Sequence, residues 1–251
     1  MEAKRQWAEG QLDLFVEKPA GERPRLRARP KDGLFPCGKC SKGYVFFAKG
    51  EYSYTAECEC MGLSKLATRF DAMRLPPAAM AASIDDWKAN GARPGADAIR
   101  EWAGAFKPGI RGRIFMGANG VGKSWTAGAL ARLVCLGGAS VRWVKWSELL
   151  DDLRDCYAAQ EPEHAVTMPL LSCDLLVVDD LGQEQKTEWS GVACERILGR
   201  RLEDGGTTLI TTNAVSDEEL REIVGARVFS RAVGACERIR MTGRDLRGVR
   251  P

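Results

Sequence analysis

The residues with the clearest chemistry lie in one eight-residue stretch near the middle of the chain. Residues 117–124 read Gly-Ala-Asn-Gly-Val-Gly-Lys-Ser, which is the spacing of a phosphate-binding loop. Glycines let the backbone turn tightly enough for its N–H groups to face phosphate oxygens. The N-terminus of a following helix adds the positive end of its dipole. The pattern predicts a loop that binds Mg-ATP.

Each residue of this loop has an expected role. Lys123 is expected to reach the β- and γ-phosphates, and the hydroxyl of Ser124 to hold Mg²⁺. The alternative is a chance match in a glycine-rich loop, but a predicted strand precedes the loop and a predicted helix follows it. The predicted nucleotide-binding residues are Gly117, Ala118, Asn119, Gly120, Val121, Gly122, Lys123, Ser124 and Trp125.

Two acidic residues supply a second half of the predicted site. Asp179 and Asp180 follow the apolar run 175–178, which is typical of a strand buried on both faces. Ligands of α/β sheets bind at the carboxyl ends of such strands. We expect Asp179 to hold the Mg²⁺ shell and Asp180 to accept a proton from the attacking water. The alternative is a strand that ends in two solvated acids.

A third polar residue ends the next predicted strand. The sequence Thr211-Thr212-Asn213 closes the β-branched run 207–211, and an amide at that place can orient the water and sense the γ-phosphate. By itself, an Asn after a strand is simply a turn residue. The two preceding motifs favour the functional interpretation of Asn213.

These side chains need a scaffold of alternating strands and helices, and the sequence predicts one. Ser147 and Ser216 are expected to cap helices, the latter with Glu219 in a capping box. The alternation implies an α/β fold, a parallel sheet with right-handed crossovers. Strands are predicted at 112–116, 141–146, 175–178, 207–211 and 238–241, and helices at 96–106, 123–136 and 188–202.

Four cysteines near the N-terminus have the spacing of a metal site. Cys37-x-x-Cys40 and Cys58-x-Cys60 are separated by 17 residues, which suggests a tetrahedral Zn²⁺ site of four thiolates. Segments 44–47 and 52–55 are predicted to form a hairpin between the two pairs. The alternative is four free cysteines in a loop. The remaining thiols are expected in the core: Cys135, Cys156, Cys173, Cys194 and Cys236.

The amino-acid composition limits the class of protein to which the chain can belong. Of 251 residues, 45% are hydrophobic and 28% are charged, and the net charge is +3, as in ordinary globular proteins. No apolar stretch resembles a secretory signal or a membrane span, so we expect a cytosolic protein without structural disulfides. The predicted organisation is a flexible segment 1–33, a zinc-binding module 34–64, a linker with helices 65–107, and an ATPase domain 108–251.

The ordered motifs resemble a known family over about residues 75–251. The loop, Asp179-Asp180-Leu181-Gly182 with Thr187-Glu188-Trp189, the Thr-Thr-Asn triplet, and Gly-Ala-Arg-Val-Phe-Ser-Arg at 225–231 are together similar to AAA+ ATPases of the DnaC/IstB-like group. The resemblance implies an AAA+ P-loop NTPase with a parallel five-stranded sheet and without a C-terminal lid domain. Because Asp180 stands where many AAA+ proteins have Glu, we expect slow hydrolysis.

The resemblance also implies that subunits share the site. Arg231 matches the arginine finger, which neutralises charge on the γ-phosphoryl of a neighbouring subunit, so we expect a homo-oligomer on ATP binding. The alternative is a surface helix that carries two arginines. Arg247 falls where the family places a second sensor arginine.

The cysteine module favours one branch of the family. It is similar to the zinc-binding domain of replicative helicase loaders, so the first hypothesis is an ATP-dependent loader of a DnaB-type hexameric helicase onto single-stranded DNA. The second is an IstB-like transposition helper that acts on duplex DNA, and the third a nucleotide-switched zinc-ribbon adaptor. Trp143, Lys145 and Trp146 are of the types that bind single strands, but tryptophans on an alternating strand are more often core residues.

Overall fold

The computed structural model describes residues 44–49, 52–57, 59–80, 82, 96–243, 245 and 246. The chain divides into two compact units, Met1–Arg69 and Phe70–Pro251. The predicted flexible segment 1–33 lies outside the described residues.

The described part of the first unit contains a β-hairpin. Strands β1 (Tyr44–Lys49) and β2 (Tyr52–Glu57) are antiparallel, and their register runs from the pair Tyr44 and Glu57 to the pair Lys49 and Tyr52. This confirms the hairpin predicted between the two cysteine pairs. Helix α2 (Glu59–Met73) follows and contains the boundary between the units.

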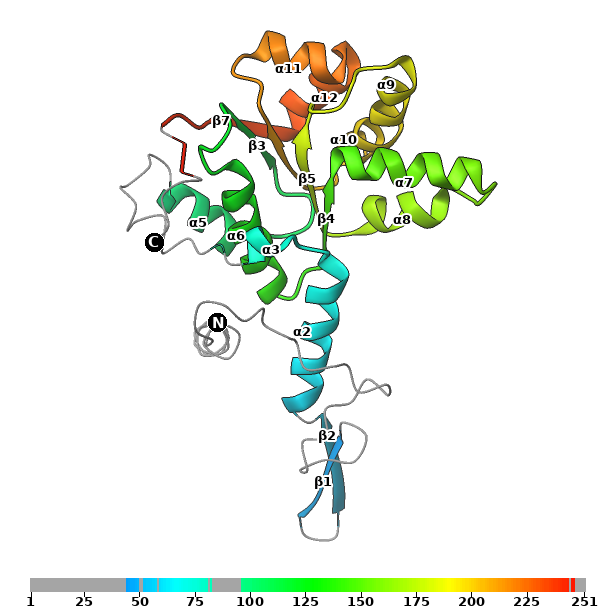
Figure 1. The fold of residues 1–251 in the computed structure, drawn as a ribbon. Coiled ribbons are helices and arrows are strands. Elements are labelled where there is room, and N and C mark those ends of the chain that lie inside the picture. The colour runs from blue at the N-terminus through cyan, green and yellow to red at the C-terminus, as the bar shows by residue number, and fades with distance from the viewer. Residues whose placement is uncertain are drawn as a thin grey trace. The chain divides into compact units, whose positions relative to one another are not determined.

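The second unit is built on a five-stranded parallel sheet with the strand order β4-β5-β6-β3-β7 (Figure 1). The predicted α/β fold with a parallel five-stranded sheet is therefore confirmed. The strands are β3 (Gly112–Met116), β4 (Val141–Lys145), β5 (Leu175–Leu181), β6 (Thr208–Thr212) and β7 (Cys236–Arg240).

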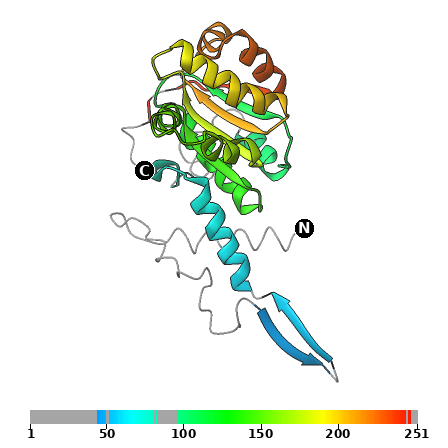
Figure 2. The same cartoon turned by 90° about the vertical axis from the view of Figure 1, so that its right-hand side faces the viewer.

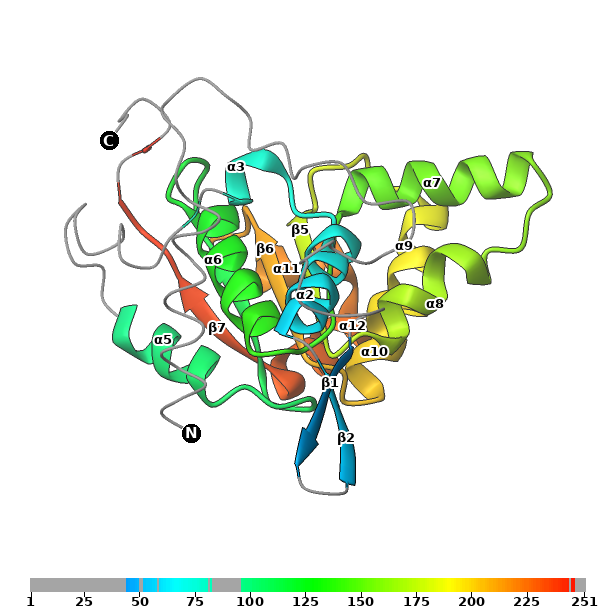
Figure 3. The ribbon, with the colours of Figure 1, turned by 90° about the horizontal axis from the view of Figure 1, so that it is seen from below.

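Helices cover both faces of this sheet (Figures 2 and 3). One face packs against α3 (Pro77–Met80), α5 (Ala96–Gly104) and α6 (Lys123–Leu136). The other face packs against a larger helical layer. Its members are α7 (Trp146–Ala158), α8 (His164–Ser172), α9 (Glu188–Cys194), the π-helical turn η1 (Glu195–Gly199), α10 (Arg200–Glu203), α11 (Asp217–Val224) and α12 (Ala226–Ala235).

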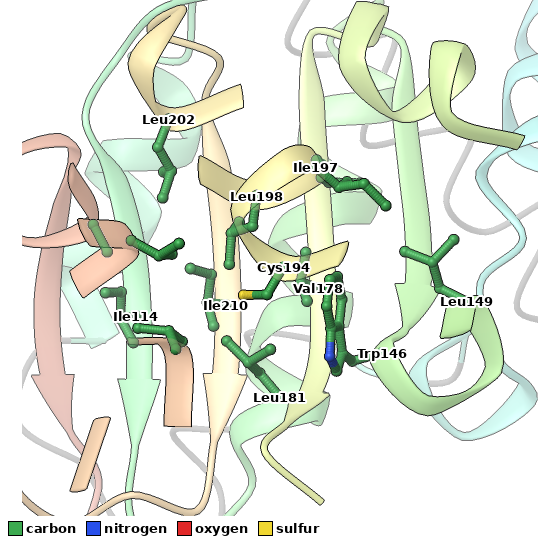
Figure 4. Close-up of a cluster of buried hydrophobic side chains, with 14 of the residues drawn as sticks. Ile114, Trp146, Leu149, Val178, Leu181, Cys194, Ile197, Leu198, Leu202 and Ile210 are labelled. Carbon is green, nitrogen blue, oxygen red and sulfur yellow. The ribbon is translucent and has the colours of Figure 1, made fainter. Parts of the chain in front are cut away.

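The central strands are buried on both faces, as their uninterrupted apolar runs predict. Val178 and Ile210 contribute to the core under the larger helical layer, together with Leu198 and Ile197 from η1 (Figure 4). Val177 and Leu209, the preceding residues of the same strands, belong to the core on the opposite face. Burial on both sides holds these strands between the two helical layers, and the polar residues that end β5 and β6 follow directly on these buried segments.

The local predictions for the helix ends have mixed outcomes. Helix α6 spans the predicted residues, and Ser216 caps α11 by accepting a 3.1 Å hydrogen bond from the backbone N–H of Glu219. The prediction that Ser147 caps the next helix is wrong, because α7 begins at Trp146. Strand β4 leads into α7 without a loop, so Ser147 already lies in the first turn of the helix.

The tryptophans of β4 and α7 belong to the core. Trp143 is 4% exposed and Trp146 is 1% exposed, so neither offers a ring face to a nucleic-acid base. The interpretation of these residues as a single-strand platform is therefore wrong, and the core alternative is confirmed. The five cysteines expected in the core are all buried, as predicted. No helix among the described residues is long and apolar enough to cross a membrane.

One buried arginine ties the strand starts to the helices. Arg201 in α10 is 1% exposed, and its guanidinium donates hydrogen bonds of 2.8–2.9 Å to the carbonyl oxygens of Leu170, Cys173 and Thr207. Leu170 lies near the C-terminus of α8, where exposed carbonyls favour a positive charge. The contacts join α10, α8 and the start of β6, at the sheet edge opposite the phosphate-binding loop.

Candidate nucleotide-binding site

The phosphate-binding loop connects β3 to α6 and has a backbone that glycine favours. The φ angles of Gly117, Gly120 and Gly122 are 145°, 77° and 93°, in the region that other residues rarely adopt. At Gly117 a Cβ atom would also lie only 2.1 Å from the carbonyl oxygen of Met241. Conformation and close packing therefore both require glycine at the start of the loop.

Lys123 joins the loop to the end of β6. Its side chain is buried, and Nζ donates hydrogen bonds to the carbonyl oxygens of Gly117 and Ala118 at 2.7 and 2.8 Å. A third bond, of 2.8 Å, reaches Oδ1 of Asn213. The structure thus brings together the lysine of the first motif and the amide of the third, which are 90 residues apart in the chain.

Asp179 lies between Ser124 and Thr211. Its Oδ1 accepts a 2.6 Å hydrogen bond from the hydroxyl of Thr211, and the hydroxyl of Ser124 is close enough to affect the pKa of the same carboxylate. Burial raises the pKa of the Asp179 carboxyl above its ordinary value, while these two hydroxyl groups act to lower it. The two residues predicted to hold Mg²⁺, Ser124 and Asp179, therefore lie near one another.

Asp180 has an unusual backbone conformation at the same strand end. Its φ angle is 56°, which is rare for a residue with a side chain and is often found at functional sites. Its backbone N–H donates a 2.9 Å hydrogen bond to the hydroxyl of Thr211. Asp180 is half-buried, so its carboxylate remains accessible to water.

These residues fit Mg-ATP. The glycine loop and the N-terminus of the 14-residue helix α6 present backbone N–H groups suited to phosphate oxygens. The hydroxyl of Ser124 and the carboxylate of Asp179 are the hard oxygen ligands that Mg²⁺ prefers. ATP would lie along residues 117–125, and Mg²⁺ would neutralise charge on its phosphates. Among the described residues, no group of three or more His, Cys, Asp or Glu side chains could hold a metal ion.

Thr211 is a site residue that sequence reasoning missed. It was recognised only as part of the triplet before Asn213, yet its fully buried hydroxyl contacts both acidic residues. Strand β6 is buried throughout and ends in the two threonines Thr211 and Thr212, and a buried hydroxyl needs a hydrogen-bond partner. The threonines within residues 207–212 were the sequence signal for a buried hydroxyl, but they do not identify the partner of that hydroxyl.

Arg231 lies apart from this cluster. It is on α12, its side chain is 31% exposed, and it forms a 2.9 Å ion pair with Glu203. Helix α12 leads into β7, whose first residue Cys236 pairs with Gly112 at the start of β3. The phosphate-binding loop follows the other end of β3, so the structure does not bring Arg231 to the loop of its own chain. Arg247 lies outside the described residues.

The proposed zinc ligands are mostly beyond what the structure describes. Cys37, Cys40 and Cys58 lie outside the described residues, and Cys60 lies in the first turn of α2. The β1–β2 hairpin separates the two cysteine pairs in the chain.

The sequence model of the family described as "IstB-like ATP binding protein" matches residues 65–242, which is more than half of the chain. The chain belongs to this family. The match includes the glycine loop, both acidic residues, Asn213 and Arg231, so the motifs that carried the resemblance lie within the family's own region. Phe70–Pro251 is accordingly the unit with the AAA+ ATPase fold of this IstB-like family.

Individual relatives of this IstB-like protein carry the name "Replicative helicase loader DnaC". The DnaC of Buchnera aphidicola subsp. Acyrthosiphon pisum is 26% identical over 156 residues, which cover 61% of this chain and 63% of that protein. The DnaC of Escherichia coli K12 is 28% identical over 133 residues, which cover 53% and 54%. The matches thus span a little over half the length of these relatives.

Solved structures support the fold. The crystal structure of the DnaC helicase loader superposes with a TM-score of 0.55 at 24% identity, covering 59% of this chain and 88% of that one. The structure of DnaI gives a TM-score of 0.59 at 21% identity, covering 68% and 96%. The AMPPCP-bound DnaA of Aquifex aeolicus gives 0.56 at 16% identity, covering 67% and 51%. At these identities the likeness shows that the IstB-like chain shares their fold.

The buried carboxylate of Asp179 leads to a stability prediction. Because burial raises its pKa in the folded state, the ionised form destabilises the nucleotide-free protein, and this effect disappears as the pH falls through that raised pKa. We expect Asp179→Asn to increase the free energy of unfolding by about 0.5–2 kcal/mol at neutral pH without Mg²⁺. The gain should shrink towards acid pH, as measured by urea denaturation across pH.

The control is Asp204→Asn, which changes an exposed carboxylate paired with Arg200 and should alter stability little. A loss of stability in Asp179→Asn, or a gain that does not depend on pH, would contradict the prediction.

Proposed function

We propose that this chain is an ATPase that loads a DnaB-type hexameric helicase onto single-stranded DNA. The observation that carries the ATPase part is the hydrogen bond of Lys123 to Asn213, with Asp179 and Ser124 near one another beside it. Four residues predicted to bind and cleave ATP thus meet at one edge of the sheet. The helicase part is supported by the relatives named replicative helicase loaders and by the cysteine pairs ahead of the ATPase fold.

In this proposal each side chain acts on ATP or on the attacking water. Lys123 contacts the β- and γ-phosphates and stabilises the charge that develops on the transferred group. Asn213 orients the water, and Asp180 accepts its proton. Ser124 and Asp179 hold Mg²⁺, whose charge stabilises the phosphate oxygens. Hydrolysis is expected to be slow because an Asp rather than a Glu is the base.

The site is proposed to be completed by a second subunit. Arg231 lies toward the sheet edge away from its own phosphate-binding loop, where it forms an ion pair with the exposed Glu203. An exposed ion pair of this kind contributes little to stability, so Arg231 can exchange Glu203 for a phosphate of a neighbouring subunit. This requires that the chains form a homo-oligomer in the presence of ATP.

A mixing experiment tests the shared site. Arg231→Ala should lower ATP turnover by roughly a thousandfold, and so should Lys123→Ala. When the two variants are mixed, the intact loop of one and the Arg231 of the other meet in the same site, so turnover should partly recover. Hydrolysis is measured as released phosphate.

Arg227→Ala is the matched control, because Arg227 lies one turn earlier on α12 and is more exposed. It should leave turnover close to wild type. Full turnover in Arg231→Ala, or a mixture no more active than its parts, would rule out donation of Arg231.

A second candidate function is supported by the family itself, whose description is IstB-like. In that case the chain would act on duplex DNA as a transposition helper. The DNA preference in the presence of ATP separates the two functions, because a loader should prefer single strands and a transposition helper should prefer duplex. The buried Trp143 and Trp146 leave the DNA-contacting residues unassigned.

Purification with the helicase tests the loader function. The wild-type chain should co-purify with the DnaB-type helicase encoded by the same genome, and with ATP it should transfer that helicase to circular single-stranded DNA. Lys123→Ala should lower hydrolysis by roughly a thousandfold, whereas Lys107→Ala, at an exposed lysine, should not. No recovery of helicase would exclude the loader, and equal hydrolysis in wild type and Lys123→Ala would favour an adaptor without turnover.

We also propose that Cys37, Cys40, Cys58 and Cys60 bind Zn²⁺ as four thiolates. The support is the spacing of the pairs and the hairpin between them. Purified protein should contain about one zinc ion per chain by mass spectrometry. The double change Cys37→Ser and Cys40→Ser should remove it, and Cys156→Ser, at a buried thiol outside the motif, should not. Zinc-free wild-type protein would show the proposal to be wrong.

A further inference from the structure

The two acidic residues of the site lie in a β-bulge. Along the pairing of β5 with β6, Val178 faces Ile210 and Leu181 faces Thr212. Two residues of β5, Asp179 and Asp180, therefore stand opposite the single residue Thr211 of β6. An extra residue on one strand bends that strand and re-aims its side chains, and such bulges are frequent beside active sites.

The burial pattern of β5 shows the effect of this extra residue. Side chains of a regular strand alternate between faces, so Val178 and Leu181, three positions apart, should face opposite sides of the sheet. Both instead belong to the same core cluster (Figure 4). The side chains change faces at Asp180, which alone among residues 175–181 has a positive φ angle, of 56°.

A single hydroxyl holds both bulged residues. Oγ1 of Thr211 donates a 2.6 Å hydrogen bond to Oδ1 of Asp179 and accepts a 2.9 Å hydrogen bond from the backbone N–H of Asp180. Thr211 is fully buried. A bulge interrupts the hydrogen-bonding ladder of the sheet, and here the threonine hydroxyl supplies partners to the groups at the interruption.

We propose that Thr211 is the positioning residue of the nucleotide site: its hydroxyl fixes the bulge that aims Asp179 at Mg²⁺ beside Ser124 and sets the place of Asp180. The inference rests on the proposed ATP hydrolysis and deepens it. Thr211 acts through the two acids. The hydroxyl both orients the Asp179 carboxylate and holds the backbone of Asp180 in its left-handed conformation, so its loss affects both residues.

The test compares two substitutions at this position with a matched one elsewhere in the strand. Thr211→Val removes the hydroxyl and keeps a β-branched side chain, whereas Thr211→Ser keeps the hydroxyl. The control is Thr208→Val. Thr208 is equally buried and lies in the same strand, but its hydroxyl donates to the carbonyl oxygen of Gly206 and accepts a 3.3 Å hydrogen bond from Nε of Arg201, both at the opposite edge.

Two quantities are measured on the full chain. One is the gain in affinity for a fluorescent ATP analogue when Mg²⁺ replaces EDTA. The other is the rate of ATP hydrolysis at a series of ATP concentrations, which gives kcat and KM separately. Thr211→Val should lose most of the Mg²⁺-dependent gain and lower kcat by roughly 10- to 100-fold, with little change in affinity for the analogue in EDTA. Thr211→Ser should restore both, and Thr208→Val should change neither.

Several results would overturn the inference. A Thr211→Val protein that matches Thr208→Val would do so, and so would a Thr211→Ser protein that loses the Mg²⁺-dependent gain. If Thr211→Val does not fold by circular dichroism, Thr211→Ser decides alone, because the hydroxyl is held to be sufficient. If the wild type binds Mg-ATP but shows no turnover, the proposed hydrolysis fails, and the Mg²⁺-dependent gain still decides the role of Thr211.

Discussion

The structure depends on the position of β6 between β3 and β5. Because all five strands are parallel, this order places the carboxyl ends of three strands beside one another, although they are far apart in the chain. The hydrogen bond of Lys123 to Asn213 spans 90 residues, and that of Thr211 to Asp179 spans 32. The first contact could not form if another strand separated β6 from β3, nor the second if another strand separated β6 from β5. The chemistry of the site is thus a consequence of strand order.

The scaffold holds β6 in that position at its middle and at its start. Its middle residues Leu209 and Ile210 are buried on opposite faces of the sheet. Its start is tied to α8 and α10 by the buried guanidinium of Arg201, whose charge is compensated by backbone carbonyls. Such a buried charge would be strongly destabilising without these partners. The strand that carries Thr211 and Asn213 is therefore anchored by core packing and by polar contacts at the edge opposite the site.

The sequence predicted the local features of this arrangement well. The glycine loop and helix α6 follow from patterns contained in a few neighbouring residues. The bulge at Asp180 and the role of Thr211 could not be predicted in the same way, since they depend on which strand pairs with β5 and in what register. Ser147 failed as a helix cap because β4 runs straight into α7. Trp143 and Trp146 were ambiguous because core and stacking surfaces use the same residue types.

The contacts of Lys123 connect ligand binding to this buried framework. Its three hydrogen bonds join the carbonyl groups of Gly117 and Ala118, at the start of the loop, to the amide of Asn213. In the proposed complex with ATP, a phosphate group at Nζ would compete with these acceptors, and Asn213 would then change its partner. Asn213 lies two residues from Thr211, whose hydroxyl fixes the bulge of Asp179 and Asp180. The loop and the two acids are therefore connected through three adjacent residues, Thr211 and Thr212 of β6 and Asn213 after it.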